Sequence, residues 1–123
     1  MLGYGVSNDT ELLEDLYQKI FQKKPDFVIG YVLYENDVPV GIANLKVTPE
    51  LSEIKEIGLL SEKRRKFFGD FFTRCLLLRL SEVSQKIITY QNDYFYRFGF
   101  VDEGEKMVID SKKIDFPSTC KHN

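Results

Sequence analysis

The feature that most constrains the fold is a long amphipathic helix between two segments of strand character. From Phe67 to Ser84, apolar side chains recur at helical spacing and form one broad face: Phe68, Phe71, Phe72, Cys75, Leu76, Leu78 and Leu80. Residues 52–60, before this helix, alternate approximately between apolar and polar, and residues 85–90 after it are rich in β-forming side chains. A strand, helix, strand passage of this kind fits a parallel crossover around a central, buried helix.

The sequence before residue 52 predicts a helix and two strands. Apolar residues from Asp9 to Lys24 follow a helical period, and Pro25 stops this surface helix. Asn8, Asp9 or Thr10 can cap its start. Residues 27–34 and 38–47 indicate a hairpin, which continues into residues 52–60 as a three-stranded meander.

The sequence after residue 90 predicts a short helix over 92–98 and a last strand over 100–110. The chain of 123 residues is long enough for one core and too short for two ordinary domains. We therefore expect a single domain over residues 1–123 of the α/β (α+β) class, with a mixed, largely antiparallel sheet flanked by helices.

The charge balance and the apolar runs limit the partners and the location. Seventeen Lys and Arg against nineteen Asp and Glu leave a net charge of -2, so no global positive field favours nucleic acid or an anionic membrane. Runs such as Leu76 to Leu78 are far shorter than the roughly 20 apolar residues of a membrane span. Met1 to Ser7 lacks the features of a secretory signal. We expect a cytoplasmic protein.

The two cysteines predict neither a disulfide nor a metal site. Cys75 lies in the apolar helical stretch, where a thiol acts as a small hydrophobe. Cys120 and His122, close to the end of the chain, cannot by themselves complete a tetrahedral zinc shell.

A basic turn leads into the long helix. It holds Arg64, Arg65 and Lys66 immediately before Phe67 and Phe68. A turn at a helix N-terminus presents backbone N–H groups to an anion, the helix dipole favours that anion, and basic side chains add charge for phosphate. The alternative is a solvated basic turn without a ligand.

Residues 64–69, RRKFFG, resemble motif A of the GNAT superfamily of acyl-CoA N-acyltransferases, R/Q-x-x-G-x-G/A. Phe67 stands at the first glycine position and Gly69 at the second. The resemblance implies that acetyl-CoA is the cosubstrate and that its pyrophosphate is held by the residues of this segment: Leu59, Leu60, Arg64, Arg65, Lys66, Phe67, Phe68, Gly69 and Asp70.

Residues 92–100, NDYFYRFGF, resemble the end of GNAT motif B, commonly F-Y-E-K-L-G-F. The resemblance implies a tyrosine that protonates the departing CoA thiolate. The register places Phe95 at that position, so its neighbours Tyr94 and Tyr96 are the candidates, with Tyr94 first. Asn92 is expected either to contact the pantetheine arm or to cap the short helix. The alternative for the aromatic side chains is simple core packing.

In the GNAT superfamily the general base is usually a carboxylate on the strand before motif A. Glu56 is the first choice here, and Glu53 is the second. Both fit equally well as ordinary surface charges.

Taken together, these motifs indicate a divergent, short GNAT member that transfers an acetyl group from acetyl-CoA to an amine by direct attack. The resemblance also implies that the first strand and one helix of the usual fold are shortened. A second hypothesis is a catalytically degenerate domain that binds CoA or a partner, motivated by Phe67 and Phe95. A third is an interaction module that forms a homodimer through exposed aromatic side chains and the meander edge.

Overall fold

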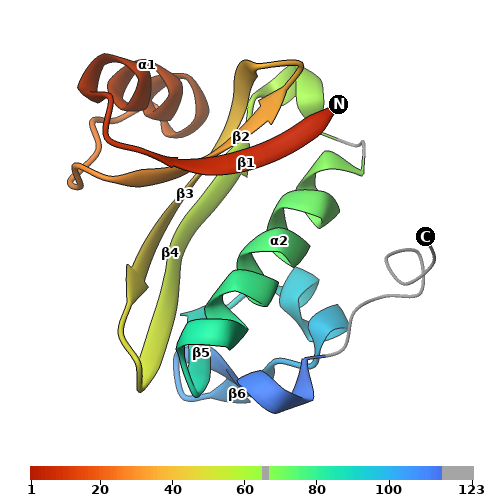
Figure 1. Ribbon diagram of the computed structural model, residues 1–123. Helices are drawn as coiled ribbons and strands as arrows, with labels where there is room; N and C mark the ends of the chain where they lie inside the picture. The colour runs from red at the N-terminus through yellow and green to blue at the C-terminus, as the bar shows by residue number, and fades with distance from the viewer. Residues whose placement is uncertain (65–66, 115–123) are drawn as a thin grey trace. The chain divides into compact units, whose positions relative to one another are not determined.

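The computed structural model describes residues 1–64 and 67–114 (Figure 1). Its strands are β1 (Leu2–Ser7), β2 (Gly30–Glu35), β3 (Val38–Val47), β4 (Leu51–Leu59), β5 (Lys86–Tyr90), β6 (Val101–Glu103) and β7 (Lys106–Asp110). Its α-helices are α1 (Thr10–Phe21) and α2 (Phe68–Val83). Three short 3₁₀ helices complete it: η1 (Ser61–Lys63), η2 (Asp93–Phe98) and η3 (Ser111–Lys113).

The strands form one sheet in the order β1-β2-β3-β4-β5-β7-β6. The β1–β2, β2–β3, β5–β7 and β6–β7 pairs are antiparallel. The β4–β5 pair is parallel, with Leu51 opposite Lys86 and Ile54 opposite Thr89. The predicted fold class, the meander order and the parallel crossover through the long helix are therefore confirmed.

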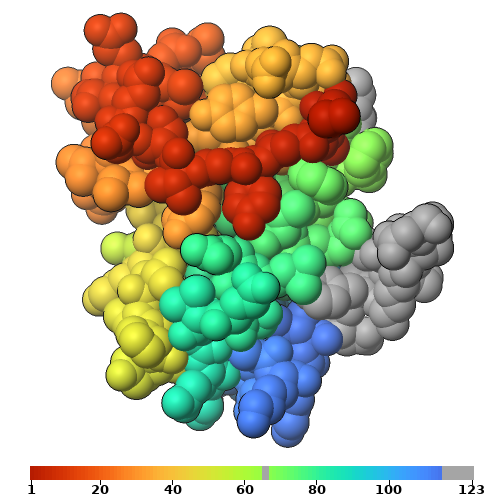
Figure 2. All heavy atoms as spheres, viewed as in Figure 1, coloured from red at the N-terminus to blue at the C-terminus, as the bar shows by residue number. Residues whose placement is uncertain are grey.

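The first strand was not predicted. Residues 2–7 read LGYGVS, and two glycines lower the strand propensity of so short a segment. Tertiary pairing overrides that preference, because β1 pairs with β2 from Leu2 opposite Glu35 to Ser7 opposite Gly30. Figure 2 shows β1, in red, running along the surface beside the orange residues of β2.

The prediction of one last strand over 100–110 is wrong. Two strands, β6 and β7, pair as an antiparallel hairpin with Glu103 opposite Lys106. Gly104 makes the reversal, since its φ of 65° lies in the left-handed region that glycine adopts without steric cost.

Contacts along the chain divide it into two compact units. The first comprises Met1–Leu45 and Glu56–Phe72, and the second comprises Lys46–Lys55 and the chain from Thr73 onward. In the first unit, the apolar face of α1 packs against β2 and β3 in a cluster of buried side chains: Leu13, Leu16, Tyr17, Ile20, Val32 and Ile42. The second unit buries side chains of α2, β5, η2 and β7, among them Leu77, Ile87, Phe95, Phe98 and Met107.

The start of α1 follows the predicted signal, but its end does not, because α1 ends at Phe21, before the predicted end at Lys24 and Pro25. The Asp9 carboxylate accepts a hydrogen bond from the Leu12 N–H at 3.2 Å and so caps α1, which places the cap on one of the three predicted residues. Gln22 ends α1 in a left-handed conformation, with φ 59°. No helix in the described part of the chain combines the length and the apolar content needed to cross a bilayer.

Candidate functional site

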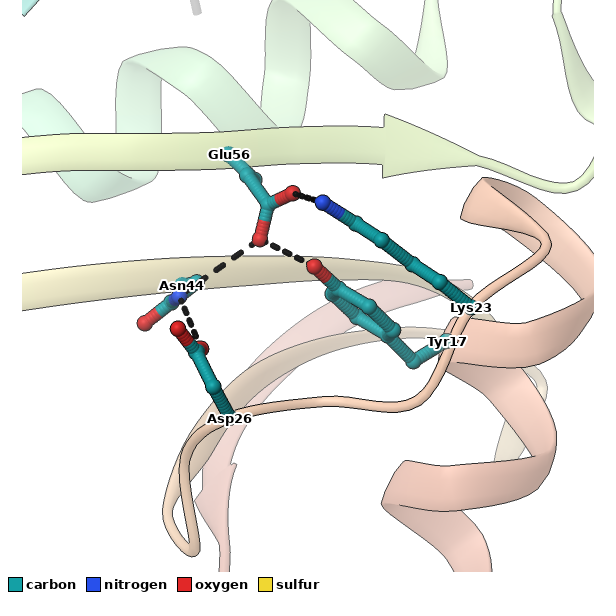
Figure 3. A network of polar contacts seen from close by, with 5 residues as sticks. All are labelled: Tyr17, Lys23, Asp26, Asn44 and Glu56. Carbon is teal, nitrogen blue, oxygen red and sulfur yellow. Dashed lines mark hydrogen bonds and ion pairs between the residues drawn. The ribbon is translucent and has the colours of Figure 1, made fainter.

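Glu56 of β4 lies at the centre of a polar network inside the first unit (Figure 3). Its carboxylate accepts a short hydrogen bond from the Tyr17 hydroxyl and forms an ion pair with the Lys23 ammonium at 3.0 Å. The Asn44 side-chain amide lies 3.5 Å from both the Glu56 and the Asp26 carboxylates. The first-choice carboxylate is therefore held by a phenol, an ammonium and an amide.

Close packing of α1 on β4 makes this network possible. A Cβ atom at Gly58 would lie 2.7 Å from Ile20 Cγ2 and 3.0 Å from Phe21 Cζ, so only glycine permits this approach of helix and strand. Tyr17 lies one helical turn before Phe21, and their ring centroids are 4.7 Å apart. The tight contact at Gly58 thus brings the Tyr17 hydroxyl within reach of Glu56.

The electrostatics keep the carboxylate ionised. Burial by itself would raise the pKa of the Glu56 carboxyl. Hydrogen bonds from Tyr17, Lys23 and Asn44, together with the Lys23 charge, outweigh burial and lower this pKa below its ordinary value. Burial and then the bond to Glu56 raise the pKa of the Tyr17 phenol, which therefore stays protonated as a donor. At neutral pH, Glu56 is a carboxylate that can accept a proton.

Residues 60–64, which follow β4, are held by contacts to β2, β3 and β4. The Leu60 N–H donates to the Val40 carbonyl at 2.9 Å, while the Leu59 side chain is buried. Arg64 Nε donates to the Leu59 carbonyl at 3.3 Å, and Lys63 forms an ion pair with Glu35 at 2.6 Å. Arg65 and Lys66 lie outside the described residues.

The start of α2 combines an exposed aromatic ring with Gly69, for which the described residues show no packing requirement. Phe67 is 66% exposed and contacts the buried Phe68 edge to face, with ring centroids 5.4 Å apart. Among the described residues, the Phe71 N–H donates to the Phe67 carbonyl at 2.9 Å at the start of α2. The N–H groups of the first turn of a helix lie outside its hydrogen-bond ladder. Asp70 lies in this first turn.

A Cβ atom at Gly69 would meet only Leu59 Cδ1, at an ordinary 3.7 Å, among the described side chains and backbone. No internal packing contact in that part of the chain therefore requires glycine there. A glycine in the first turn of a helix, without an internal reason, fits a backbone that a phosphate approaches closely.

The short helix η2 places the motif B residues in the second unit. Asn92 caps it, because its side-chain oxygen accepts from the Tyr94 N–H at 2.9 Å, which is one of the two roles expected for this residue. Phe95 is completely buried and lies edge to face with Tyr90 at 5.4 Å. The position at which the motif has its tyrosine is therefore a core position in this chain.

The two candidate tyrosines differ in their surroundings. Tyr94 is half-buried, packs edge to face on Phe95 and Phe98 at 5.5 Å, and carries the Arg97 guanidinium 4.7 Å from its ring centroid. Tyr96 is 46% exposed and donates to the Asp102 carboxylate at 2.7 Å, and this bond raises the pKa of its phenol. The acidic partner therefore makes Tyr96 a weaker proton donor than an ordinary tyrosine.

Glu53, the second-choice base, takes no part in the network around Glu56 among the contacts of the described residues. It belongs to the second unit and forms an ion pair with Lys106 at 2.5 Å. Glu56 and Glu53 therefore have separate sets of partners, although three positions separate them on one strand.

Sequence reasoning missed the partners of Glu56. The helical period of residues 9–24 assigns Tyr17 only to an apolar face and Lys23 only to the end of a helix, and it gives no role to Asn44 or Asp26. Two signals were present: a buried tyrosine hydroxyl normally needs a hydrogen-bond partner, and Asn44 is a polar residue within the apolar run of β3. Neither signal identifies the partner.

The described residues contain no group of three or more metal-ligating His, Cys, Asp or Glu side chains. Cys75 is a free, partly buried thiol on α2, and burial raises its pKa. Cys120 and His122 lie outside the described residues.

No protein-family model and no curated protein sequence matches this chain. Solved structures do. A GNAT family acetyltransferase from Brucella melitensis, in complex with acetyl-CoA, aligns with a TM-score of 0.67 at 11% identity, over 88% of each chain. An acetyltransferase from Thermus thermophilus aligns with a TM-score of 0.71 at 15% identity, over 89% of this chain and 97% of that one.

The GNAT family N-acetyltransferase YhbS from Escherichia coli, in complex with CoA, aligns with a TM-score of 0.69 at 12% identity, over 90% of this chain and 81% of that one. These similarities extend over nearly the whole length of this chain. The chain has the GNAT fold.

Proposed function

We propose that this protein is an N-acetyltransferase that uses acetyl-CoA and transfers the acetyl group to an amine. The observation that carries the proposal is the GNAT fold itself, shared over about nine-tenths of the chain with acetyltransferases that include complexes with acetyl-CoA and CoA. The motif at the start of α2 supports it, since Gly69 leaves the backbone open where the pyrophosphate would approach.

Acetyl-CoA, when bound, would supply the thioester carbonyl carbon that the amine attacks. The residues proposed to hold it are those of the turn and of the first turn of α2: Leu59, Leu60, Arg64, Arg65, Lys66, Phe67, Phe68, Gly69 and Asp70. Glu56 is the proposed general base, because its carboxylate is ionised and already holds an ammonium group at 3.0 Å. Tyr94 is the proposed acid, with Tyr96 second.

Calorimetry with acetyl-CoA and mass spectrometry of an amine panel test the proposal. We expect saturable binding and an acetylated product. The Gly69→Ala variant sharpens the test: alanine favours a helix over glycine by roughly 0.8–1.0 kcal/mol, so the fold should be kept while the affinity for acetyl-CoA falls. Absence of binding at millimolar acetyl-CoA would contradict the proposal.

One observation favours a second candidate, a GNAT-fold protein that binds CoA without catalysis. Phe95 is completely buried at the position where the motif has a tyrosine. Binding of acetyl-CoA without any acetylated product, across the amine panel and across pH, would support this candidate over the enzyme.

A further inference from the structure

The Lys23 ammonium is held in the manner of a bound amine. Gln22 ends α1 in a left-handed conformation, and Lys23, the next residue, extends back over the Tyr17 ring, with its Nζ 5.9 Å from the ring centroid. The same Nζ lies 3.0 Å from the Glu56 carboxylate (Figure 3). A carboxylate and an aromatic face are both groups that attract an ammonium ion strongly.

The charges of the network favour a cation at this place. Two carboxylates, Glu56 and Asp26, are joined through the Asn44 amide, and Lys23 is the one cation with a contact to Glu56 among the described residues. Tyr17 contributes a neutral donor. The network therefore retains a net negative charge even with the Lys23 ammonium in place.

Lys19 provides a comparison close by in the chain. Lys19 and Lys23 have the same side-chain exposure, 60%, and each forms an ion pair at 3.0 Å. The partner of Lys19 is Asp15, which is 66% exposed, whereas the partner of Lys23 is Glu56, which is 22% exposed. The two side chains are thus equally exposed, and their ammonium groups differ in the carboxylate that they face.

We propose that the network around Glu56 is the acceptor-amine site and that the Lys23 ammonium, which occupies it, is itself an acetyl acceptor. This inference rests on the proposed function. It also indicates the class of external acceptor: a primary amine on a flexible, unbranched alkyl chain, such as a lysine side chain, which replaces Lys23 between Glu56 and the Tyr17 ring.

The reaction balances without a further reactant. The Glu56 carboxylate takes one proton from the Lys23 ammonium, and the neutral nitrogen then forms a bond to the carbonyl carbon of acetyl-CoA. The C–S bond breaks, the thiolate takes a proton from the proposed general acid, the second proton of the nitrogen restores that acid, and Glu56 returns the first proton to solvent. Lys23 becomes a neutral acetyl-lysine, loses its ion pair with Glu56 and vacates the site.

Peptide mapping of the full chain after incubation with acetyl-CoA tests the inference. Spontaneous acetylation depends on exposure, so it should label Lys19 and Lys23 alike. Labelling assisted by a general base should favour Lys23 over Lys19 by about 100-fold, the lower end of the usual contribution of such a base. In Glu56→Gln the Lys23 labelling should fall to the Lys19 level, and Lys19→Arg should leave Lys23 labelling unchanged.

A second measurement separates this inference from the proposed function. Lys23→Arg keeps a cation at Glu56 but removes the acceptor nitrogen, and it is assayed with butylamine and an N-blocked lysine. Equal labelling of Lys19 and Lys23, or Lys23 labelling that survives Glu56→Gln, overturns the inference. If Lys23→Arg then still acetylates the amines, the proposed function is kept and only the inference about Lys23 is rejected. If acetyl-CoA does not bind at all, the proposed function and the inference are both rejected.

Discussion

The network around Glu56 joins side chains from α1, the loop after it, β3 and β4, whereas the aromatic contacts of η2 join neighbours within one short segment. Tyr17 and Glu56 are 39 positions apart in the sequence, while Tyr94, Phe95 and Phe98 meet within one turn or two. The first region depends on the spacing of distant backbones. The second depends on filling a volume next to its own chain.

This difference has a functional counterpart. The polar region holds an ionised carboxylate ready to accept a proton, and each of its contacts is directional. In the aromatic region, Phe95 is buried in the core at the position where the family motif has its acidic tyrosine. Perturbation of backbone spacing should therefore affect the first region, and loss of side-chain volume should affect the second.

The largest effect is expected from Phe95→Ala in the aromatic region. Phe95 is completely buried and contacts the rings of Tyr90, Tyr94 and Phe100. Removal of a buried phenyl ring costs about 3–5 kcal/mol, and urea unfolding should show a loss of that size. A loss below about 1 kcal/mol would mean that the core collapses around the gap.

Gly58→Ala tests whether backbone spacing controls the polar region. The new Cβ would lie 2.7 Å from Ile20 Cγ2, so α1 must move away from β4, at a cost of about 2 kcal/mol in the free energy of unfolding. The short Tyr17–Glu56 hydrogen bond should lengthen, which NMR of the Tyr17 hydroxyl proton can detect. Gly69→Ala is the matched control, because its Cβ has room and stability should not fall.

Tyr17→Phe removes one directional contact and leaves the ring in place. Loss of the hydrogen bond to the Glu56 carboxylate should cost about 1.5 kcal/mol at pH 7. Because this bond lowers the pKa of Glu56, its contribution is present above the unfolded pKa of the carboxyl and disappears as the pH falls through the folded one. The gap in stability between the two proteins should therefore close on acidification.

NMR titration of the Glu56 side chain provides the direct measurement. Lys23 and Asn44 still lower the pKa of the carboxyl in the variant, whereas the contribution of the Tyr17 hydrogen bond is lost, so the pKa of Glu56 should rise. An unchanged pKa in Tyr17→Phe would show that Lys23 and Asn44 keep Glu56 ionised without the Tyr17 hydrogen bond.

The smallest effect is expected from Tyr96→Phe. The hydroxyl is exposed and its bond to Asp102 lies on the surface, so the unfolding midpoint should not change measurably. The acetylation rate should also persist, whereas Tyr94→Phe should slow it if Tyr94 is the acid. The reverse order of rates would assign the acid to Tyr96.

Local signals predicted most of the elements. The apolar period of residues 67–84 places α2 at Phe68–Val83, and Asp9 caps α1 as one of three expected residues. The strand character on both sides of α2 led to the parallel β4–β5 pair. Two features were not predicted, because local sequence does not reveal them. Residues 2–7 form the strand β1 by pairing with β2, and the turn at Gly104 divides the predicted last strand into two.

The sequence by itself determined α1, the meander of β2 to β4, α2 and the crossover to β5. It also put Glu56 before Glu53 as the general base, and that choice stays a prediction. These follow from periodicity, caps and motif register, which are properties of neighbouring residues. Only the tertiary structure decided that Glu56 meets Tyr17, Lys23 and Asn44, and that Phe95 belongs to the core. Hydrogen bonds and burial depend on distances between segments far apart in the chain, and no short stretch of sequence encodes those distances.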